Sequence, residues 1–415
     1  MKIHQISQCR VCGNENLIEI VSLGNQVLTG VFPKSQDDVV PSGPLELVKC
    51  HGENACHLVQ LRHSFEADQM YGMNYGYRSG LNTSMVAHLK EKATRLQELN
   101  PLTPADLVLD VGSNDGTSLS FYPAEVTRVG MDPTIVKFGK FYQPGIHAIP
   151  EFFSASSFRS RFGDRKAKII SSIAMFYDLE EPMKFVADIA EVIADNGVWH
   201  FEQSYMPLMM ERNAYDTICH EHVEYYALYQ IQWMLERCGL RILDVEINDI
   251  NGGSFAVTAC KESAPFLTNK STVESMFEKE NNIGLTTLVP YEAFKNRVFK
   301  HRDELKSLVS KLIAGGSTIM GYGASTKGNV LLQFCEFTNK ELTAVAEVNP
   351  DKFGTYTPGT KIPIISETEA HGRKPDYFLV LPWHFRDNLV SREQEFLKAG
   401  GRMIFPLPDI EIIGG

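Results

Sequence analysis

The stretch Leu107-Val108-Leu109-Asp110-Val111-Gly112-Ser113-Asn114-Asp115-Gly116-Thr117 predicts a buried strand, a glycine-containing turn and the start of a helix. Gly112 and Gly116 carry no Cβ, so backbone amides can approach a ligand closely at this turn. The next apolar stretch, residues 126–131, ends in Asp132, about twenty residues further on, where a carboxylate can accept both hydroxyls of a ribose. Together these signals predict a ligand that contains a nucleoside.

The turn departs from the dinucleotide motif GxGxxG, because no third glycine follows and there is less provision for a pyrophosphate. Its form, Asp-x-Gly-x-x-x-Gly, resembles the S-adenosylmethionine motif of class I methyltransferases. The resemblance implies an α/β core with the cofactor at the end of this strand. The residues expected to bind S-adenosylmethionine are Asp110, Gly112, Asn114, Gly116, Asp132 and Met175.

Further apolar stretches continue the same alternation of helices and strands. A helix is expected over residues 84–99, and strands over residues 168–173, 197–201, 240–247 and 254–259. The last two strands would form an antiparallel pair across Asn251-Gly252-Gly253. Glu202 and Ser204 follow the strand at 197–201, at the carboxyl edge where α/β folds bind ligands. We expect both to contact the substrate.

The chain is polar and helical in pattern over residues 269–312 and then begins a second α/β unit. Residues 317–329 predict a strand, a glycine loop and a helix, in which Gly323 and Lys327 offer an open backbone and a cation to a phosphate. An apolar tight turn without a ligand is the alternative for this loop. Further strands of a parallel sheet are expected over residues 342–348, 362–365, 377–381 and 402–405. His384 follows the third of these strands on the same edge and is expected to contact the substrate.

Four of the eight cysteines lie close to the N-terminus. They are Cys9, Cys12, Cys50 and Cys56. The first two form a CxxCG knuckle, a tight turn that points two thiolates at one ion, and a tetrahedral structural zinc site is the expected product. The second pair is more widely spaced, so His51 or His57 could replace one thiolate. Free structural cysteines are the alternative.

Residues 215–226, Tyr-Asp-Thr-Ile-Cys-His-Glu-His-Val-Glu-Tyr-Tyr, combine two histidines, three acids and three tyrosines. Apolar positions alternate here with groups that move protons near neutral pH, which indicates a loop at a reactive centre. His220 and His222 would face the same side if the backbone were extended. The alternative is an aromatic core segment whose histidines are satisfied by their neighbours.

Residues 70–80 are rich in tyrosine and glycine and predict an ordered loop. Tyr75 and Tyr77 combine a stacking face with a hydroxyl, which suits the rim of a substrate pocket. A loop that packs between two domains is an equal alternative.

Composition restricts the class of protein. The 415 residues suffice for two or three domains, and 43% hydrophobic with 22% charged residues is ordinary for a soluble globular chain. The net charge of -11 argues against a nucleic-acid partner and against an anionic membrane surface. No apolar run approaches the length of a membrane span, and no signal-peptide block is present, so we expect a cytoplasmic protein.

These features together resemble one family, the S-adenosylmethionine-dependent C-methyltransferases that act on nucleotide-activated keto-deoxysugars. That family combines the CxxCG module, the class I core, His-Glu-His before Tyr225-Tyr226, the loop Gly321-Tyr322-Gly323-Ala324-x-x-Lys327-Gly328 and the Leu-Pro-Trp-His-Phe run at 381–385. The resemblance covers nearly all of the chain. It implies a zinc-binding module over residues 1–70, a methyltransferase core over 71–265, and a connector helix with a C-terminal Rossmann-like domain over 266–415.

The resemblance also implies roles for single residues. His222 would be the base that removes a proton next to a ketone, assisted by Glu221, and His220 is its competitor. A tyrosine of residues 71–77 would lie near the sugar, and the last domain would hold part of the nucleotide diphosphate. The sequence leaves the oligomeric state open, and we expect a monomer.

Three positions depart from family members that methylate carbon 3 of the sugar. Those members often have Asn and His where this chain has Ser172 and Phe176, and often Tyr where Cys219 stands. The sugar, the nucleotide and the methylated carbon therefore stay open. An O-methyltransferase, an NAD-dependent sugar-nucleotide oxidoreductase and a non-catalytic sugar-nucleotide scaffold are the alternatives. The oxidoreductase leaves the zinc module without a purpose, and the dense His/Glu/Tyr stretch argues against the scaffold.

Overall fold

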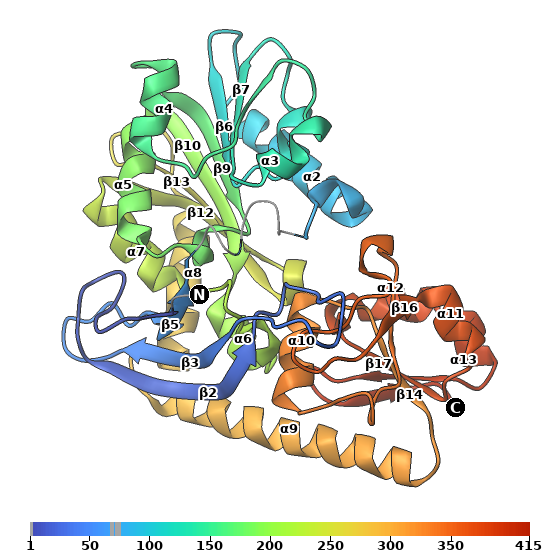
Figure 1. Cartoon of the computed structure of the whole chain (residues 1–415). Helices are drawn as coiled ribbons and strands as arrows, with labels where there is room; N and C mark the ends of the chain where they lie inside the picture. Colours follow the sequence, from blue (N-terminus) through green and yellow to red (C-terminus); the bar gives the residue numbers. More distant parts are fainter. Residues whose placement is uncertain (1–2, 67–69, 71–75) are drawn as a thin grey trace.

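The computed structural model describes residues 3–66, 70 and 76–415. Within this part of the chain there are sheets of seven, six and four strands and one two-stranded sheet. In Figure 1 the seven-stranded sheet (green) lies above the four-stranded sheet (blue), and the six-stranded sheet (orange to red) lies to their right. Tyr75, expected at the substrate, lies outside the described residues.

The seven-stranded sheet has the order β12-β13-β10-β9-β6-β7-β8, and within it only β13 runs antiparallel to its neighbours. Its strands are β6 (Leu107–Val111), β7 (Thr127–Met131), β8 (Ile146–Ile149), β9 (Ala167–Ile173), β10 (Ile193–Ser204), β12 (Leu240–Asn248) and β13 (Ser254–Lys261). The inner strand β6 is buried along its whole length, as the Leu/Val-rich run predicts for a parallel strand covered on both faces. This topology confirms the predicted class I methyltransferase core.

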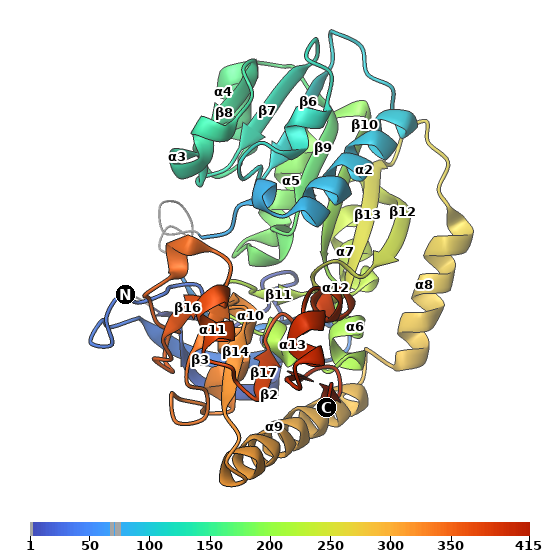
Figure 2. The same cartoon turned by 90° about the vertical axis from the view of Figure 1, so that its right-hand side faces the viewer.

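Helices cover both faces of this sheet (Figures 1 and 2). One face carries α2 (Thr83–Leu99), whose start is capped by the Asn82 side chain, and α2 packs in a hydrophobic cluster with Val108 and Ile169. The other face carries α4 (Ala155–Phe162), α5 (Pro182–Val192) and α7 (Leu228–Arg237). Short helices, α3 (Ile135–Phe138) and α6 (Met206–Glu211), complete this part of the chain.

The predicted turn after β6 contains Gly112, Asn114 and Gly116 with positive φ values of 72°, 50° and 76°, and it leads into a short 3-10 helix, Ser118–Phe121. One local prediction for the core was wrong. The strand predicted to end at residue 201 continues to Ser204, because pairing with β13 extends it. Glu202 and Ser204 therefore lie inside β10 and not after it.

The six-stranded sheet has the order β16-β15-β14-β17-β18-β19, with β19 antiparallel at the edge. Its strands are β14 (Ile319–Tyr322), β15 (Val345–Glu347), β16 (Ile364–Ser366), β17 (Tyr377–Val380), β18 (Arg402–Phe405) and β19 (Glu411–Ile413). Its helices are α10 (Thr326–Phe334), α11 (Glu367–Gly372), α12 (Arg386–Arg392) and α13 (Gln394–Lys398). The predicted parallel sheet is confirmed, and β19 is an addition that the sequence did not predict.

The polar stretch before this sheet forms two helices, α8 (Lys270–Ile283) and the long α9 (Val289–Ala314). Figure 1 shows α9 along the lower edge of the molecule, below the four-stranded sheet and the C-terminal domain. Among the described residues, no helix has both the length and the apolar character needed to cross a membrane.

The four-stranded sheet has the order β11-β4-β3-β2 and draws on two distant parts of the chain. β2 (Leu17–Val27), β3 (Ser42–Cys50) and β4 (Val59–Leu61) come from the cysteine-rich segment, and β11 (Glu224–Tyr225) comes from the His-Glu-His segment. The small second sheet pairs β1 (Ile3–Gln5) with β5 (His63–Phe65). The division of the chain at residues 70 and 265 stays a prediction.

Candidate active site

The four cysteines of the N-terminal segment converge, and their sulfur atoms all lie within 4.8 Å of one another. The Sγ atoms of Cys9 and Cys56 are 3.5 Å apart and those of Cys12 and Cys50 are 3.4 Å apart, so these cysteines form no disulfide. Four thiolates at about 2.3 Å from one zinc ion stand roughly 3.8 Å from each other. The cluster therefore fits a tetrahedral zinc ion.

Neither histidine near this cluster belongs to it. The Nδ1 atom of His57 lies 3.1 Å from the Nζ atom of Lys49 instead, and Asn14 donates a hydrogen bond to the Cys50 sulfur at 3.3 Å. The fourth ligand is thus Cys56. A closed four-cysteine site leaves no open position for a substrate, which identifies a structural role.

The predicted cofactor loop is held by Asp132, which the sequence predicted as an acceptor for the hydroxyls of a ribose. Its carboxylate accepts hydrogen bonds from the backbone N–H of Asn114 at 2.8 Å and of Thr134 at 2.6 Å. Burial raises the pKa of Asp132, and these donors oppose the rise. Asp110 is also buried, which raises its pKa to about 7, and it accepts a hydrogen bond from Ser171 at 2.6 Å. Asp110 thus lies near the end of β6, before this loop, and Asp132 directly follows β7.

Both glycines of this loop have close neighbours. A Cβ on Gly112 would lie 2.8 Å from the side chain of Met175, and a Cβ on Gly116 would lie 2.9 Å from the ring of Tyr142. Met175, one of the predicted cofactor residues, therefore packs directly on the turn. Tight packing requires these glycines in addition to any close approach of a ligand.

The segment before α2 covers the same loop, which the sequence did not predict. The N–H of Ser79 donates to Asn114 at 2.9 Å, and the N–H of Gly80 donates to Asp115 at 3.0 Å. The carbonyl oxygen of Tyr77 accepts from the Asn114 amide at 3.1 Å, and the Tyr77 side chain is largely exposed. Tyr77 is thus a rim residue of the cofactor loop.

His222 has one defined tautomer. Its Nδ1 atom lies 3.0 Å from the Thr217 carbonyl oxygen, which can only accept, so Nδ1 carries the proton and Nε2 keeps its lone pair. Burial and the nearby Lys327 ammonium lower the pKa of His222 to about 3. The Tyr177 ring packs against it with the ring centroids 4.4 Å apart. The imidazole is therefore neutral, and the lone pair of its Nε2 atom can accept a proton.

His222 lies at a small cavity formed by three segments of the methyltransferase core. The lining residues are Tyr177, Ser204, Met206, Met209, Thr217, His222, Glu224 and Tyr225. Ser204 is the predicted substrate residue that reaches this cavity. The methionines make one wall apolar, which favours exclusion of water.

The two neighbours of His222 point elsewhere, because residues 220 and 221 form a turn and not an extended strand. His220 is fully buried against the N-terminal segment, where its Nε2 lies 3.2 Å from the Gly43 carbonyl oxygen and its ring packs edge-on against Phe65. Glu221 faces the N-terminal segment as well, with Thr29 Oγ1 donating to it at 3.5 Å. Burial raises the pKa of Glu221. The structure thus brings His222, and not His220, to the cavity.

The C-terminal domain meets the same segment. The indole N–H of the buried Trp383 donates to Asp216 at 2.8 Å. Burial raises the pKa of Asp216, and the nearby Lys327 opposes part of this rise. Lys327 donates to the Asn251 carbonyl oxygen at 2.6 Å. Burial and Lys327 also lower the pKa of His384 to about 3. Lys327 and His384, both predicted substrate residues, therefore share the electrostatic environment of His222.

The glycine loop of the C-terminal domain is packed tightly. A Cβ on Gly323 would lie 2.7 Å from Pro382, and one on Gly328 would lie 2.6 Å from Leu381. The N–H of Ala324 donates to Glu347, at the end of β15, at 2.9 Å. Sequence reasoning missed Glu347, although an acid at the end of the second strand after a glycine loop is a recognisable signal.

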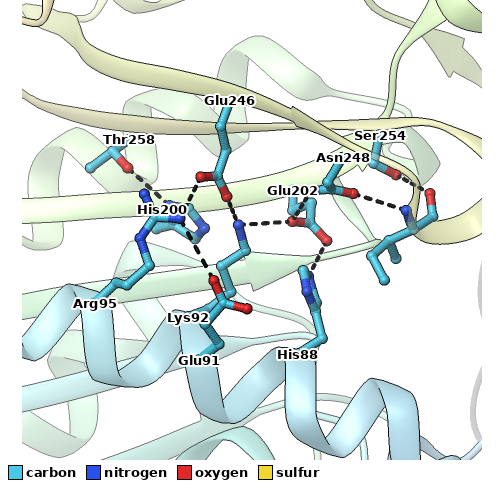
Figure 3. Close-up of polar contacts among 11 residues, drawn as sticks. His88, Glu91, Lys92, Arg95, His200, Glu202, Glu246, Asn248, Ser254 and Thr258 are labelled. Carbon is cyan, nitrogen blue, oxygen red and sulfur yellow. Dashed lines mark hydrogen bonds and ion pairs between the residues drawn. The ribbon is translucent and has the colours of Figure 1, made fainter.

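Glu202 lies away from the cavity, in a polar network between α2 and the sheet (Figure 3). Its Oε1 atom is 2.7 Å from His88 Nε2, and its Oε2 atom accepts from Asn248 at 2.8 Å and pairs with Lys92 at 3.4 Å. Burial raises the pKa of Glu202, but these partners outweigh it and lower the pKa overall. In this structure Glu202 anchors α2.

The three positions that depart from the resembling family are all buried. Ser172 accepts a hydrogen bond from Trp199 at 2.7 Å, and Phe176 stacks on Tyr226 with the ring centroids 5.3 Å apart. Burial and the nearby Glu221 raise the pKa of Cys219 well above its ordinary value. Ser172 and Phe176 thus contribute to an aromatic core behind the cavity.

A cysteine cluster that fits zinc, a class I core with an acid-held glycine loop and a neutral imidazole at a small cavity define a methyltransferase that uses S-adenosylmethionine and has a structural zinc site. Family models match residues 9–71 ("Putative zinc binding domain"), 85–245 ("Methyltransferase domain") and 249–408 ("C-methyltransferase C-terminal domain"). The C-methyltransferase NovU of Streptomyces niveus is 32% identical over 417 residues, covering 99% of this chain and 98% of NovU. The chain belongs to this C-methyltransferase family.

Solved structures resemble the core at lower identity. A methyltransferase of Clostridium acetobutylicum is 13% identical and covers 42% of this chain and 92% of its own, with a TM-score of 0.34. The magnesium protoporphyrin IX methyltransferase of Synechocystis is 13% identical and covers 43% and 88%, with a TM-score of 0.34.

Proposed function

We propose that this C-methyltransferase acts on a nucleotide-activated keto-deoxysugar and methylates the carbon next to its ketone through an enolate. The observation that carries the proposal is the neutral His222, with Nδ1 hydrogen-bonded to Thr217 and Nε2 available as a base. Methylating a carbon requires a base, whereas the methyl group itself is already activated by the sulfonium of S-adenosylmethionine.

In the proposed reaction His222 Nε2 takes the proton from the carbon beside the ketone. The electron pair of that C–H bond would become the C=C bond of the enolate as the carbonyl π pair moves to oxygen. The enolate carbon would then bond to the methyl group of S-adenosylmethionine while the S–CH3 bond breaks, its electron pair stays on sulfur, and S-adenosylhomocysteine leaves. Lys327 would pair with the diphosphate of the nucleotide, away from the reacting carbon, and so contribute to binding of the substrate. The apolar wall formed by Met206 and Met209 limits water, which would otherwise return a proton to the enolate.

Two features support a nucleotide on the substrate. Lys327 follows the glycine loop of the C-terminal domain and lies close enough to His222 to lower its pKa. Glu347 holds the N–H of Ala324 at 2.9 Å, as Asp132 holds the N–H of Asn114 at 2.8 Å. An acid in this position of a Rossmann-like sheet suits a ribose, and the two domains thus offer one such acid each.

The direct test uses solvent exchange without a methyl donor. The protein is incubated in deuterium oxide with a panel of nucleotide 4-keto-deoxysugars, and proton NMR follows the carbon positions beside the ketone. Wild type should exchange one position, and His222→Ala should reduce the rate by roughly 10²–10⁴-fold. His220→Ala is the matched control and should keep exchange, because its imidazole lies against Gly43.

With S-adenosylmethionine added, the position of the new methyl group decides between carbon and oxygen. A methyl group on a sugar oxygen would identify an O-methyltransferase and refute the proposal. Unchanged exchange in His222→Ala together with its loss in His220→Ala would transfer the role of the base to His220.

A further inference from the structure

Arg10 lies inside the zinc knuckle, between Cys9 and Cys12, yet its side chain is only 2% exposed. Its guanidinium donates to the Leu61 carbonyl oxygen at 2.7 Å and to Gln60 at 3.4 Å, both in β4. It also donates to Glu180 at 3.1 Å, which is 43% exposed. A guanidinium is always charged, so this burial needs an anionic partner.

Glu224 is the buried acid that faces Arg10. Its Oε1 atom lies 3.8 Å from Arg10 Nε, and its side chain has no exposed surface. Within the described residues, the two carboxyl oxygens of Glu224 and the Nη2 atom of Arg10 form no side-chain hydrogen bond. Burial raises the pKa of Glu224 well above its ordinary value, and the charge of Arg10 opposes this rise. Arg10 is therefore the charged group that favours the ionised form of this buried acid.

The same Glu224 lines the cavity that contains His222. It lies two residues after His222 and, as part of β11, pairs with Gln60 in β4. Val223, the residue before it, accepts a hydrogen bond from the N–H of Leu61 and donates one to the Tyr177 carbonyl oxygen, both at 2.9 Å. The segment of the proposed base is thus attached to the sheet whose strand β3 ends in Cys50.

We propose that Arg10, fixed by the zinc knuckle, positions His222 through the buried carboxylate of Glu224. The inference rests on the proposed function for the role of His222 as the base. Arg10 and Glu224 are positioning residues, since neither is proposed to touch the substrate. Without the ion pair the segment can move, and a displacement of about 1 Å at a reacting group can cost roughly 100-fold in rate.

The test reads the position of His222 without a substrate. In protein labelled with ¹⁵N-histidine, NMR reports the tautomer of each imidazole, and His222→Ala assigns the signal. Wild type should show His222 protonated only at Nδ1. Glu224→Gln and Arg10→Met should give a mixture of tautomers, while the zinc content stays at one equivalent and the affinity for S-adenosylmethionine changes less than about twofold.

Glu180→Gln is the matched control, because it removes the exposed partner of the same guanidinium and should leave the His222 signal as in wild type. In the double variant Arg10→Met/Glu224→Gln, the second substitution should add little to the first, since the two residues act as a pair. If Arg10→Met does not fold, the His222 tautomer in Glu224→Gln tests the inference by itself.

An unchanged His222 tautomer in Glu224→Gln would overturn the inference. If the melting temperature of that variant were lowered while the tautomer stayed unchanged, Glu224 would have a purely structural role. Failure of the proposed function is a separate outcome. It would appear as full deuterium exchange in His222→Ala, whatever the tautomer signals show. With an identified substrate, kcat of Glu224→Gln should fall roughly 10- to 100-fold at an unchanged KM for S-adenosylmethionine.

Discussion

His222 and Thr217 lie five residues apart, and the Nδ1 atom of the histidine is 3.0 Å from the carbonyl oxygen of the threonine. A main-chain carbonyl cannot donate, so this contact fixes the tautomer of His222. It leaves Nε2 as the atom that can accept a proton, at a cavity shared with Tyr177 and Ser204. The tautomer of His222 thus depends on a contact within its own loop.

The pKa of His222 predicts an unusual pH profile. Burial and the nearby Lys327 hold it at about 3, below the ordinary value of 6.5, so the imidazole stays neutral in weakly acidic solution. We expect the deuterium-exchange rate to be nearly constant from pH 8 to about pH 5. An acidic limb centred near pH 6.5 and dependent on His222 would contradict this.

The same shift affects stability. The unfolded chain binds a proton at His222 below about pH 6.5, whereas the folded chain does so only near pH 3. The contribution of this residue to folding is therefore complete above pH 6.5 and is lost as the pH falls from 6.5 toward 3. Thermal unfolding at pH 7 and pH 5 should show a smaller loss of melting temperature in His222→Ala than in wild type.

Asp132→Ala should weaken the binding of S-adenosylmethionine, while the affinity for the nucleotide sugar should stay nearly unchanged. We expect the carboxylate to accept the ribose hydroxyls, and it also accepts a hydrogen bond from the N–H of Asn114. Loss of charge-assisted hydrogen bonds of this kind costs about 1.5–3 kcal/mol each, or roughly 10- to 100-fold in Kd. Calorimetry with both ligands measures it, and Asp195→Ala, an exposed acid in β10, is the control. Equal losses for both ligands would show that the sites are wrongly assigned.

Cys9→Ser/Cys12→Ser should lower bound zinc from one equivalent to well below half, because two of four thiolates are lost. Metal analysis of protein purified without chelator measures the zinc content. Cys238→Ser, outside the cluster, should retain the full equivalent. Undiminished zinc in the double variant would exclude these cysteines as ligands.

Lys327→Met should raise KM for the nucleotide sugar more than it lowers kcat, since a contact to a phosphate remote from the reacting carbon binds ground state and transition state alike. Methionine keeps much of the side-chain length. Steady-state kinetics measure both parameters, with the exposed Lys340→Met as control. Tight binding of NAD by wild type would instead favour an oxidoreductase.

Signals that are local in the sequence predicted the fold well. The apolar run before Gly112 predicted the inner strand β6. A Leu/Val-rich strand between two layers of helices can be recognised from its own sequence, without knowledge of the adjacent strands. The CxxCG knuckle likewise identified a metal site, because two thiolates at this spacing already face one point. The sequence did not separate Cys56 from His51 and His57 as the fourth ligand, and the converged sulfur atoms did.

The tertiary structure alone decided how the reactive centre is built. The spacing of His220 and His222 allowed both side chains to lie on the same side of an extended backbone. In the structure the backbone turns at this point, so His220 contacts the Gly43 carbonyl oxygen and His222 lies at the cavity. β11 is only two residues long, and its pairing with β4 depends on a partner far away in the chain. Such a pairing gives no periodic signal, because its stability comes from contacts with the distant sheet and not from the local sequence. For this reason the sequence could propose His222 as the base, while only the folded chain showed that the strand after it pairs with the sheet of the N-terminal segment.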